Sequence, residues 1–280
     1  MQRRLLRRGC PFRLNLHLNA MHKKDSSLGA SASRRANSYA LPTQISGLAV
    51  FLDIDGTLLD IASTPEAVVV PPCMPFALKR MSERLDGALA LVTGRPIEFV
   101  DRLFPDAELA VSGLHGAEWR DGSGNAGRVK TTSEFNAGKL RLRQEVARWP
   151  GVVFEDKGAA FAAHYRLAPE REMPLRDLMR DLTEAVGSGW VLQEGKQVLE
   201  LRPRGRDKGD ALMAFMEAEP FSGRQPLAMG DDVTDEPMFM AANRLDGLSV
   251  RVGEDCRQSC ARYRVASPSD VRAWIERASA

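Results

Sequence analysis

The chain has 280 residues, of which 44% are hydrophobic and 27% are charged, a composition typical of a globular protein with a buried core. These values exclude a disordered, collagen-like or disulfide-dependent chain, and no apolar run approaches the ~20 residues that span a bilayer. The net charge of +2 hides an asymmetry, because residues 1–45 hold nine Lys or Arg against one acid and the remainder carries −6. We therefore expect neither a nucleic-acid nor a membrane partner.

Residues 1–45 are rich in Arg, Ser, Asn and Ala and lack periodicity, so we predict a basic, disordered and dispensable tail. Its Arg-rich start is similar to a transit peptide, but the polar interruptions in residues 14–18 argue against a secretory signal. Met21 is an alternative start. The four cysteines are scattered without any C-x-x-C spacing, which favours a reducing, cytoplasmic location.

Strands and helices alternate at the start of the body. Short apolar runs predict buried parallel strands over 48–52, 88–92 and 108–111. A helix follows Pro71 and Pro72, and another begins at Pro96. The first helix has an approximate apolar stripe, made of Phe76, Leu78, Met81 and Leu85. This order is typical of a doubly wound α/β domain.

The pattern changes after Glu118. A turn over 121–127 precedes predicted helices near 134–148 and 170–186, a strand ending at 164–166, and a hairpin of 190–193 with 197–201. The α/β pattern resumes at 205, with strands over 226–229 and 248–252 and a last helix from 270. We therefore predict a core of residues 46–116 and 204–280, interrupted by an α+β cap of residues 117–203.

Polar clusters follow the predicted strands of the core, where ligands bind in open parallel sheets. These clusters are Asp53, Asp55 and Thr57; Thr93; and Asp231, Asp232 and Asp235, while Lys208 opens a helix. Crowded carboxylates stay ionised when a cation joins them, and an all-oxygen set favours Mg²⁺. Mg²⁺, Thr93 and Lys208 together suit a phosphate dianion. Each cluster alone also fits a turn or a helix start, and it is the four in this order that indicate a site.

These clusters resemble the four motifs of the haloacid dehalogenase (HAD) phosphatase superfamily, which carries its larger caps between motifs two and three. The stretches 91–95, 113–118, 195–203 and 230–236 further resemble the trehalose-6-phosphate phosphatase family. The resemblance covers about residues 46–255. One departure is Asp207 before Lys208, where family members commonly have a small or amide residue.

The resemblance implies a role for each motif residue. Asp53 is expected to form an aspartyl-phosphate and Asp55 to act as general acid and base. Asp53, the Asp55 carbonyl and Asp231 are expected to hold Mg²⁺, with Asp232 and Asp235 acting through water or Lys208. The expected phosphate ligands are Gly56, Thr57, Thr93 and Lys208.

The resemblance also implies that the cap reads the sugar through Glu194, Lys196 and Glu200, although a solvated hairpin gives the same pattern. Arg95 is expected to touch substrate or to pair with a core acid, and His115 to line the pocket or to orient a loop. The implied substrate is trehalose 6-phosphate, made by a trehalose-6-phosphate synthase. The alternatives are another sugar phosphate, such as sucrose phosphate or mannosyl-phosphoglycerate, and a non-catalytic sugar-phosphate sensor.

Overall fold

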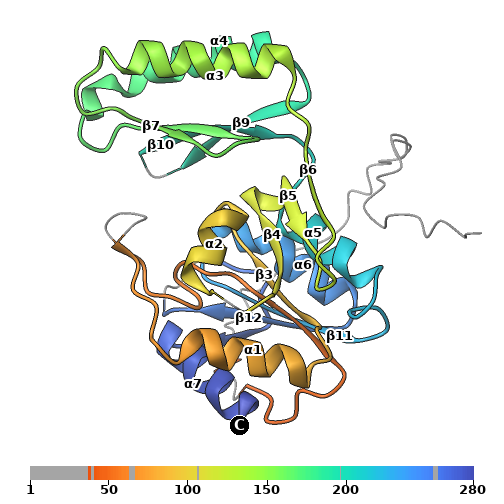
Figure 1. The fold of residues 1–280 in the computed structure, drawn as a ribbon. Coiled ribbons are helices and arrows are strands. Elements are labelled where there is room, and N and C mark those ends of the chain that lie inside the picture. The colour runs from red at the N-terminus through yellow and green to blue at the C-terminus, as the bar shows by residue number, and fades with distance from the viewer. Residues whose placement is uncertain (1–36, 39–40, 63–66, 106, 196, 255–257) are drawn as a thin grey trace, which may run out of the picture.

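A large sheet with helices on both faces carries a smaller sheet covered by two helices (Figure 1). The computed structural model describes residues 37–38, 41–62, 67–105, 107–195, 197–254 and 258–280. The strands of the large sheet, in spatial order, are β1 (Asn37–Ser38), β13 (Tyr263–Val265), β12 (Leu248–Val252), β11 (Gln225–Gly230), β2 (Leu48–Leu52), β3 (Leu89–Val92), β4 (Ala110–Gly113), β5 (Glu118–Arg120) and β6 (Ala126–Arg128). In this spatial order, every pair of neighbouring strands from β1 through β13, β12, β11, β2 and β3 to β4 is parallel, and the antiparallel strands β5 and β6 extend the sheet beyond β4.

Helices cover the large sheet in the doubly wound manner predicted from the sequence. In Figure 1, α1 (Met74–Arg84) and α7 (Pro268–Ser279) lie side by side, and α5 (Lys208–Met216) packs beside α6 (Glu236–Arg244). The short helix α2 (Ile97–Leu103) lies next to β4. All five residues of β2 are buried because helices close both faces of a parallel sheet. The stripe predicted for α1 is wrong at one position, since Phe76 is exposed while Leu78, Met81 and Leu85 are buried.

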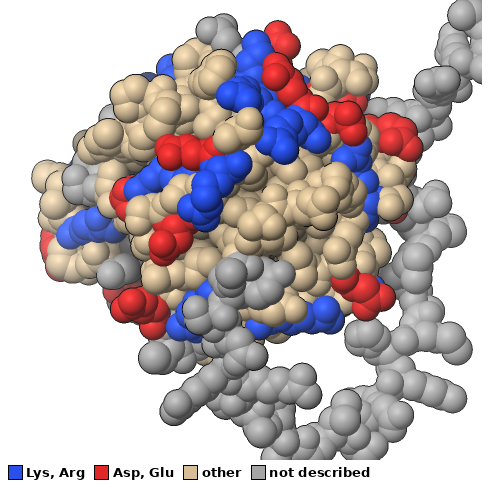
Figure 2. Space-filling view, turned by 90° about the horizontal axis from the view of Figure 1, so that it is seen from below, with Lys and Arg blue, Asp and Glu red and all other residues tan. Residues whose placement is uncertain are grey.

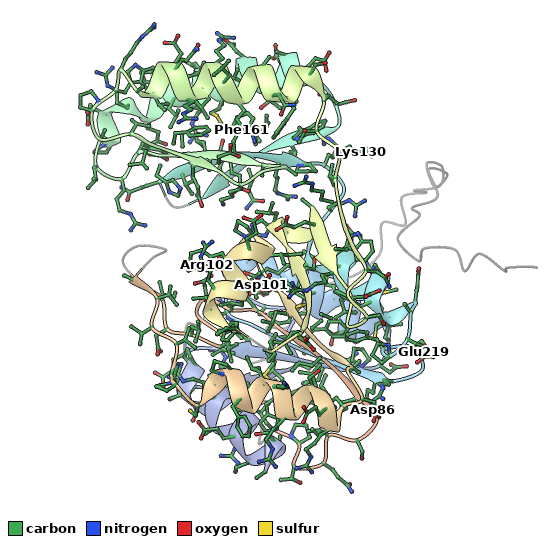
Figure 3. The ribbon with its side chains drawn as sticks, in the orientation of Figure 1. Asp86, Asp101, Arg102, Lys130, Phe161 and Glu219 are labelled. Carbon is green, nitrogen blue, oxygen red and sulfur yellow. The ribbon has the colours of Figure 1, made fainter. Side chains whose placement is uncertain are left out.

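The smaller sheet is antiparallel, in the order β7 (Val153–Asp156), β8 (Phe161–His164), β10 (Val198–Pro203) and β9 (Trp190–Gly195). We call this unit the cap. Helices α3 (Ser133–Val146) and α4 (Glu172–Val186) cover the face turned away from the large sheet (Figure 1). Phe161 points into the layer between sheet and helices (Figure 3), where its ring lies 5.1 Å from that of Phe135. The cap thus has a hydrophobic core of its own.

Two details differ from the expected boundaries. Strands β5 and β6 follow residue 117, yet they belong to the large sheet: β5 pairs with β4 and β6 pairs with β5, because an antiparallel hairpin can extend that exposed edge. Residues 41–45 lie before the expected start of the core, yet Ile45 is buried and Leu41 packs against the core. Three short 3₁₀ helices, Leu114–Gly116, Pro169–Arg171 and Val233–Asp235, complete the described elements.

The face opposite the cap carries a mixture of charges. In Figure 2, Lys and Arg side chains on this face lie beside Asp and Glu side chains, with wide neutral areas between them. Among the described residues of this face, Lys and Arg do not form a continuous basic surface. Within the described ranges, each helix is too short or too polar to cross a membrane.

Candidate active site

Three adjacent strands of the large sheet deliver the predicted polar residues to one place. Strands β3, β2 and β11 are parallel neighbours, so their carboxyl ends meet at one edge. Thr93 follows β3, Asp53 follows β2 and Asp231 follows β11. Asp53 and Thr93 are buried there, and Asp231 is half-buried.

Lys208 lies between two carboxylates at the centre of this edge. Its Nζ is 2.7 Å from Asp53 Oδ1 and 2.6 Å from Asp235 Oδ1, and all three side chains are buried. Burial alone would lower the pKa of Lys208, but the carboxylates of Asp235 and Asp53 raise it. The ammonium therefore stays charged and fixed where a phosphate would bind.

Asp207, the departure noted in the sequence, has a structural role at the start of α5. Its side chain accepts hydrogen bonds from the N–H groups of Gly209 (2.8 Å) and Asp210 (2.9 Å), while Asp210 accepts from the N–H of Asp207 (3.1 Å). This reciprocal cap fixes the first turn of the helix, whose first residue is Lys208.

Asp235 organises the loop after β11. Its Oδ2 accepts hydrogen bonds from the N–H groups of Asp231 (2.9 Å) and Asp232 (3.0 Å), while its Oδ1 contacts Lys208. Gly230 makes this arrangement possible, because a Cβ there would lie 2.2 Å from Asp235 Cγ. Asp235 therefore holds Lys208 and the backbone of Asp231 in place together.

The loops after β2 and β11 approach each other closely. Gly56 has a φ of +82°, and a Cβ on it would lie 2.2 Å from Asp231 Oδ2. The Thr57 hydroxyl donates to Asp231 Oδ1 at 3.1 Å. Only glycine at position 56 lets the first acidic loop reach the second.

One oxygen from each of Asp53, Asp231 and Asp235 lies within 4.8 Å of the others. Burial and the neighbouring Asp235 raise the pKa of Asp231 to about 6, and burial raises the pKa of Asp53 well above its ordinary value although Lys208 opposes this. Three carboxylates and one ammonium leave two negative charges in excess. The residues present therefore fit a hard divalent cation.

Asp55 turns away from this acidic cluster and pairs with Arg95. The guanidinium Nε and Nη2 each lie 2.5 Å from one carboxylate oxygen, and its Cζ lies 4.3 Å from the centre of the Phe99 ring on α2. Of the two roles expected for Arg95, the structure shows the pairing with a core acid. The Arg95 N–H also donates to the Thr93 hydroxyl at 3.1 Å.

The predicted phosphate ligands are gathered here, but several of their donors already have partners: the Thr57 hydroxyl donates to Asp231, and Lys208 contacts Asp53 and Asp235. Because Thr93 Oγ1 accepts from Arg95, its own hydrogen can be donated to a phosphate oxygen. The Gly56 N–H, expected to remain available for phosphate, instead donates to the Leu59 carbonyl at 2.7 Å and closes the loop.

His115 lies over the loop that carries Thr93. Its backbone is left-handed, with φ 54° and ψ 37°, and its N–H donates to the Thr93 carbonyl at 3.1 Å. A Cβ on Gly94 would lie 2.6 Å from His115 Nε2. Burial, together with the charges of Lys208, Lys157 and Arg202, lowers the pKa of His115 to about 3, so the imidazole is neutral at physiological pH.

The cap face opposite α3 and α4 carries a buried ion pair. Strand alternation turns Leu199 and Leu201 toward the cap helices and Glu200 toward the core. Glu200 Oε2 lies 2.7 Å from Lys157 Nζ, while Glu200 Oε1 is buried and has no hydrogen-bond partner among the described residues. A buried acceptor without a donor suits a ligand hydroxyl.

The structure separates the other cap residues predicted to read the sugar. Glu194 lies opposite Leu199 in the register and pairs with Arg176 of α4, so it occupies the helix side of the sheet, away from Glu200. Lys196 lies outside the described residues.

Two residues of the site region were given no role from the sequence. Lys157 meets Glu200 from 43 positions away, and no local spacing predicts that contact. Glu118 accepts a hydrogen bond from the Ile97 N–H at 2.5 Å and so caps α2 from the neighbouring strand β5.

Comparison with known proteins agrees with this geometry. The trehalose-phosphatase family model matches residues 51–269. A probable trehalose-phosphate phosphatase of Sinorhizobium fredii is 49% identical over 236 residues, covering 84% of this chain and 89% of the relative. The trehalose-6-phosphate phosphatase of Escherichia coli is 41% identical over 227 residues, covering 81% of this chain and 84% of the relative.

Solved structures share the arrangement of core and cap. The C-terminal domain of Candida albicans trehalose-6-phosphate phosphatase has a TM-score of 0.70 at 21% identity, covering 87% of this chain and 98% of that one, which shows the fold. A trehalose-6-phosphate phosphatase related protein has a TM-score of 0.65 at 28% identity, covering 82% of this chain and 95% of that one. The family model spans most of the sequence, both relatives are well above 30% identical, and the chain belongs to the trehalose-phosphatase family.

Proposed function

We propose that the chain hydrolyses trehalose 6-phosphate to trehalose and phosphate with the help of Mg²⁺. The observation that carries the proposal is the placement of Asp53 against Lys208 and beside Asp231 at the sheet edge, in a chain of this family. The cap face with Glu200 lies opposite that edge (Figure 1) and supports a sugar phosphate as the substrate.

In the first half of the reaction, a carboxylate oxygen of Asp53 attacks phosphorus and the bond from phosphorus to the sugar oxygen breaks. Asp55, two residues further on, gives its proton to the departing oxygen. Lys208 and the Thr93 hydroxyl bind the phosphoryl oxygens as charge develops on them.

In the second half, water attacks the phosphorus of the aspartyl-phosphate, Asp55 takes a proton from that water, and the bond to Asp53 breaks. Phosphate leaves, and Asp53 and Asp55 return to their starting states. The same two residues thus serve both half-reactions.

Asp53, the Asp55 carbonyl and Asp231 would hold Mg²⁺. Its charge offsets that of the phosphate, so that an anionic carboxylate can approach. Asp235 keeps Asp231 in place through its bonds to the loop backbone.

The test is phosphate release from a panel of sugar phosphates, with Mg²⁺ present or chelated. We expect trehalose 6-phosphate to be hydrolysed fastest and chelation to stop the reaction. Preference for sucrose phosphate or mannosyl-phosphoglycerate would move the proposal to another sugar phosphate. Binding without turnover would identify a sensor.

We further propose that the protein acts in the cytoplasm, after a trehalose-6-phosphate synthase. Two observations support this proposal. The described cysteines, Cys73 and Cys260, are free thiols, which suits a reducing compartment. The proposed substrate is the product of such a synthase.

A further inference from the structure

Arg202 lies where the chain returns from the cap to the core. Its Nε donates to Gln193 Oε1 on the neighbouring cap strand β9. Its Nη1 donates to the Arg206 carbonyl at 2.7 Å and to the Pro203 carbonyl at 3.3 Å. One planar guanidinium therefore joins the cap sheet to residues 204–207, which we call the return linker.

The return linker leads directly to the catalytic edge. The Arg206 carbonyl is followed by Asp207, whose side chain caps α5, and then by Lys208. Arg206 also donates from Nη1 to the Gly116 carbonyl at 3.4 Å, which lies between the core strands β4 and β5. The contact of Arg202 with the Arg206 carbonyl thus lies two residues before the lysine that pairs with Asp53.

The cap end of this connection carries the sugar-facing residue. Glu200 and Arg202 are two positions apart on β10, so they share the sheet face that is turned toward the core. Gln193, the partner of Arg202, lies directly opposite Glu200 in the register. A single strand therefore presents Glu200 to the substrate and ties itself, through Arg202, to the start of α5.

We propose that Arg202 is a positioning residue that fixes the cap relative to Lys208, so that a sugar seated on the cap presents its phosphate to Asp53 in reacting geometry. This inference rests on the proposed function. Rates depend steeply on alignment, and a displacement of about 1 Å can cost 10²-fold. A guanidinium held by acceptors on both sides of a hinge limits such displacement.

Arg204 provides a matched control in the same linker. Its side chain also joins the linker to the cap, by donating to the carbonyls of Ser188 (3.0 Å) and Trp190 (3.5 Å). It carries the same charge as Arg202 and is exposed, but among the described residues its side chain does not contact the Arg206 carbonyl. Arg204→Gln therefore removes an arginine from the linker without removing the connection to α5.

The experiment compares Arg202→Gln, Arg202→Lys and Arg204→Gln by steady-state kinetics on trehalose 6-phosphate and on an aryl phosphate. We expect Arg202→Gln to lower kcat for the disaccharide phosphate about 10-fold or more, with KM changed less than threefold. Hydrolysis of the aryl phosphate, which has no sugar for the cap to hold, should stay within twofold. The kcat of Arg202→Lys for the disaccharide phosphate should lie between those of the wild type and Arg202→Gln, and the kcat of Arg204→Gln should match that of the wild type.

A higher KM with unchanged kcat would mean that Arg202 binds substrate directly, and equal loss on both substrates would mean damage to the core. Either result, or no change, overturns the proposal. If Arg202→Gln does not fold, the same comparison of kcat on the two substrates is made with Arg202→Lys, and its result tests the proposal.

Amide hydrogen exchange over residues 203–208 of the substrate-free full chain gives a readout independent of turnover. We expect faster exchange in Arg202→Gln and unchanged exchange in Arg204→Gln, and equal exchange in both variants would also overturn the proposal. If the wild type fails to hydrolyse trehalose 6-phosphate, the proposed function falls while this exchange comparison still tests the connection.

Discussion

Arg95 and Asp55 form a two-point ion pair in which both contacts measure 2.5 Å. Both carboxylate oxygens are occupied by the guanidinium, so Asp55 has to turn away from Arg95 before it can reach a leaving oxygen. Because the backbone N–H of Arg95 also donates to the Thr93 hydroxyl, one residue contacts both Asp55, the proposed general acid, and Thr93, a proposed phosphate ligand.

Replacing Asp55 by Asn should slow turnover of the sugar phosphate about 10²–10⁴-fold, the usual contribution of general acid–base catalysis. The change is nearly isosteric, so the circular dichroism spectrum should be unchanged. Rates on sugar and aryl phosphates measure the role, because an aryl oxide leaves with less need of a proton. Equal slowing on both substrates would contradict the general-acid assignment.

Replacing Asp53 by Asn should abolish turnover on every phosphate ester, because an amide cannot form the aspartyl-phosphate. It also removes one of the two carboxylates that hold Lys208. Phosphate release and mass spectrometry of the trapped intermediate are the measurements. Near-normal turnover in this variant would exclude the covalent mechanism.

The sequence predicted which residues gather at the ends of the parallel strands, whereas the contacts that depend on strand register came only from the fold. Asp53, Thr93 and Lys208 were predicted to meet because each follows a buried strand or opens a helix, and parallel strand ends converge. The contact of Lys157 with Glu200 depends on the register of β7, β8 and β10, which no spacing reveals. Glu194 and Glu200 were predicted together from a shared motif, but strand alternation turns them to opposite faces.

The pKa of Asp231, raised to about 6, predicts a pH dependence of Mg²⁺ binding. The folded, metal-free protein binds a proton on Asp231 more tightly than the unfolded chain does, so this group stabilises the fold below about pH 3.8 and loses that contribution as pH rises through about 6. Mg²⁺ needs the ionised forms of Asp231 and of Asp53, whose pKa is also raised, so its apparent affinity should fall at least about tenfold per pH unit below 6.

The measurement is the shift in melting temperature caused by Mg²⁺ at pH 5 and at pH 7.5. We expect a larger shift at the higher pH. Asp231→Asn is the control, because it removes the titrating group and should bind Mg²⁺ weakly at both values. A wild-type shift that does not depend on pH would place the metal elsewhere.

Replacing Glu200 by Ala should lower kcat/KM for the disaccharide phosphate at least 10-fold and leave aryl phosphate hydrolysis nearly unchanged. Glu200 acts on the sugar, far from phosphorus, and its binding energy serves to close the cap. Glu194→Ala is the matched variant: its pairing with Arg176 on the helix side predicts a small effect on both substrates. If Glu200→Ala lowered kcat/KM equally for both substrates, or lowered it for neither, Glu200 would have no role in recognising the sugar.

The segment before the first core strand should tolerate removal only as far as residue 36. Beyond that point, the Pro42 carbonyl accepts a hydrogen bond from the Trp274 indole at 2.8 Å, Leu41 packs on the core, and Ile45 is 4% exposed. A truncated chain that starts at Asn37 keeps every described contact, so it should match the full 280-residue chain in its free energy of unfolding and in kcat. A chain that starts at Ser46 exposes α7 and loses one buried and one partly buried apolar side chain, Ile45 and Leu41, a cost of about 2–5 kcal/mol in the free energy of unfolding. Urea unfolding of the three chains, followed by the fluorescence of the buried Trp274 among the tryptophans, measures that difference. Equal midpoints for the chains that start at residues 37 and 46 would show that the segment does not contribute to the core.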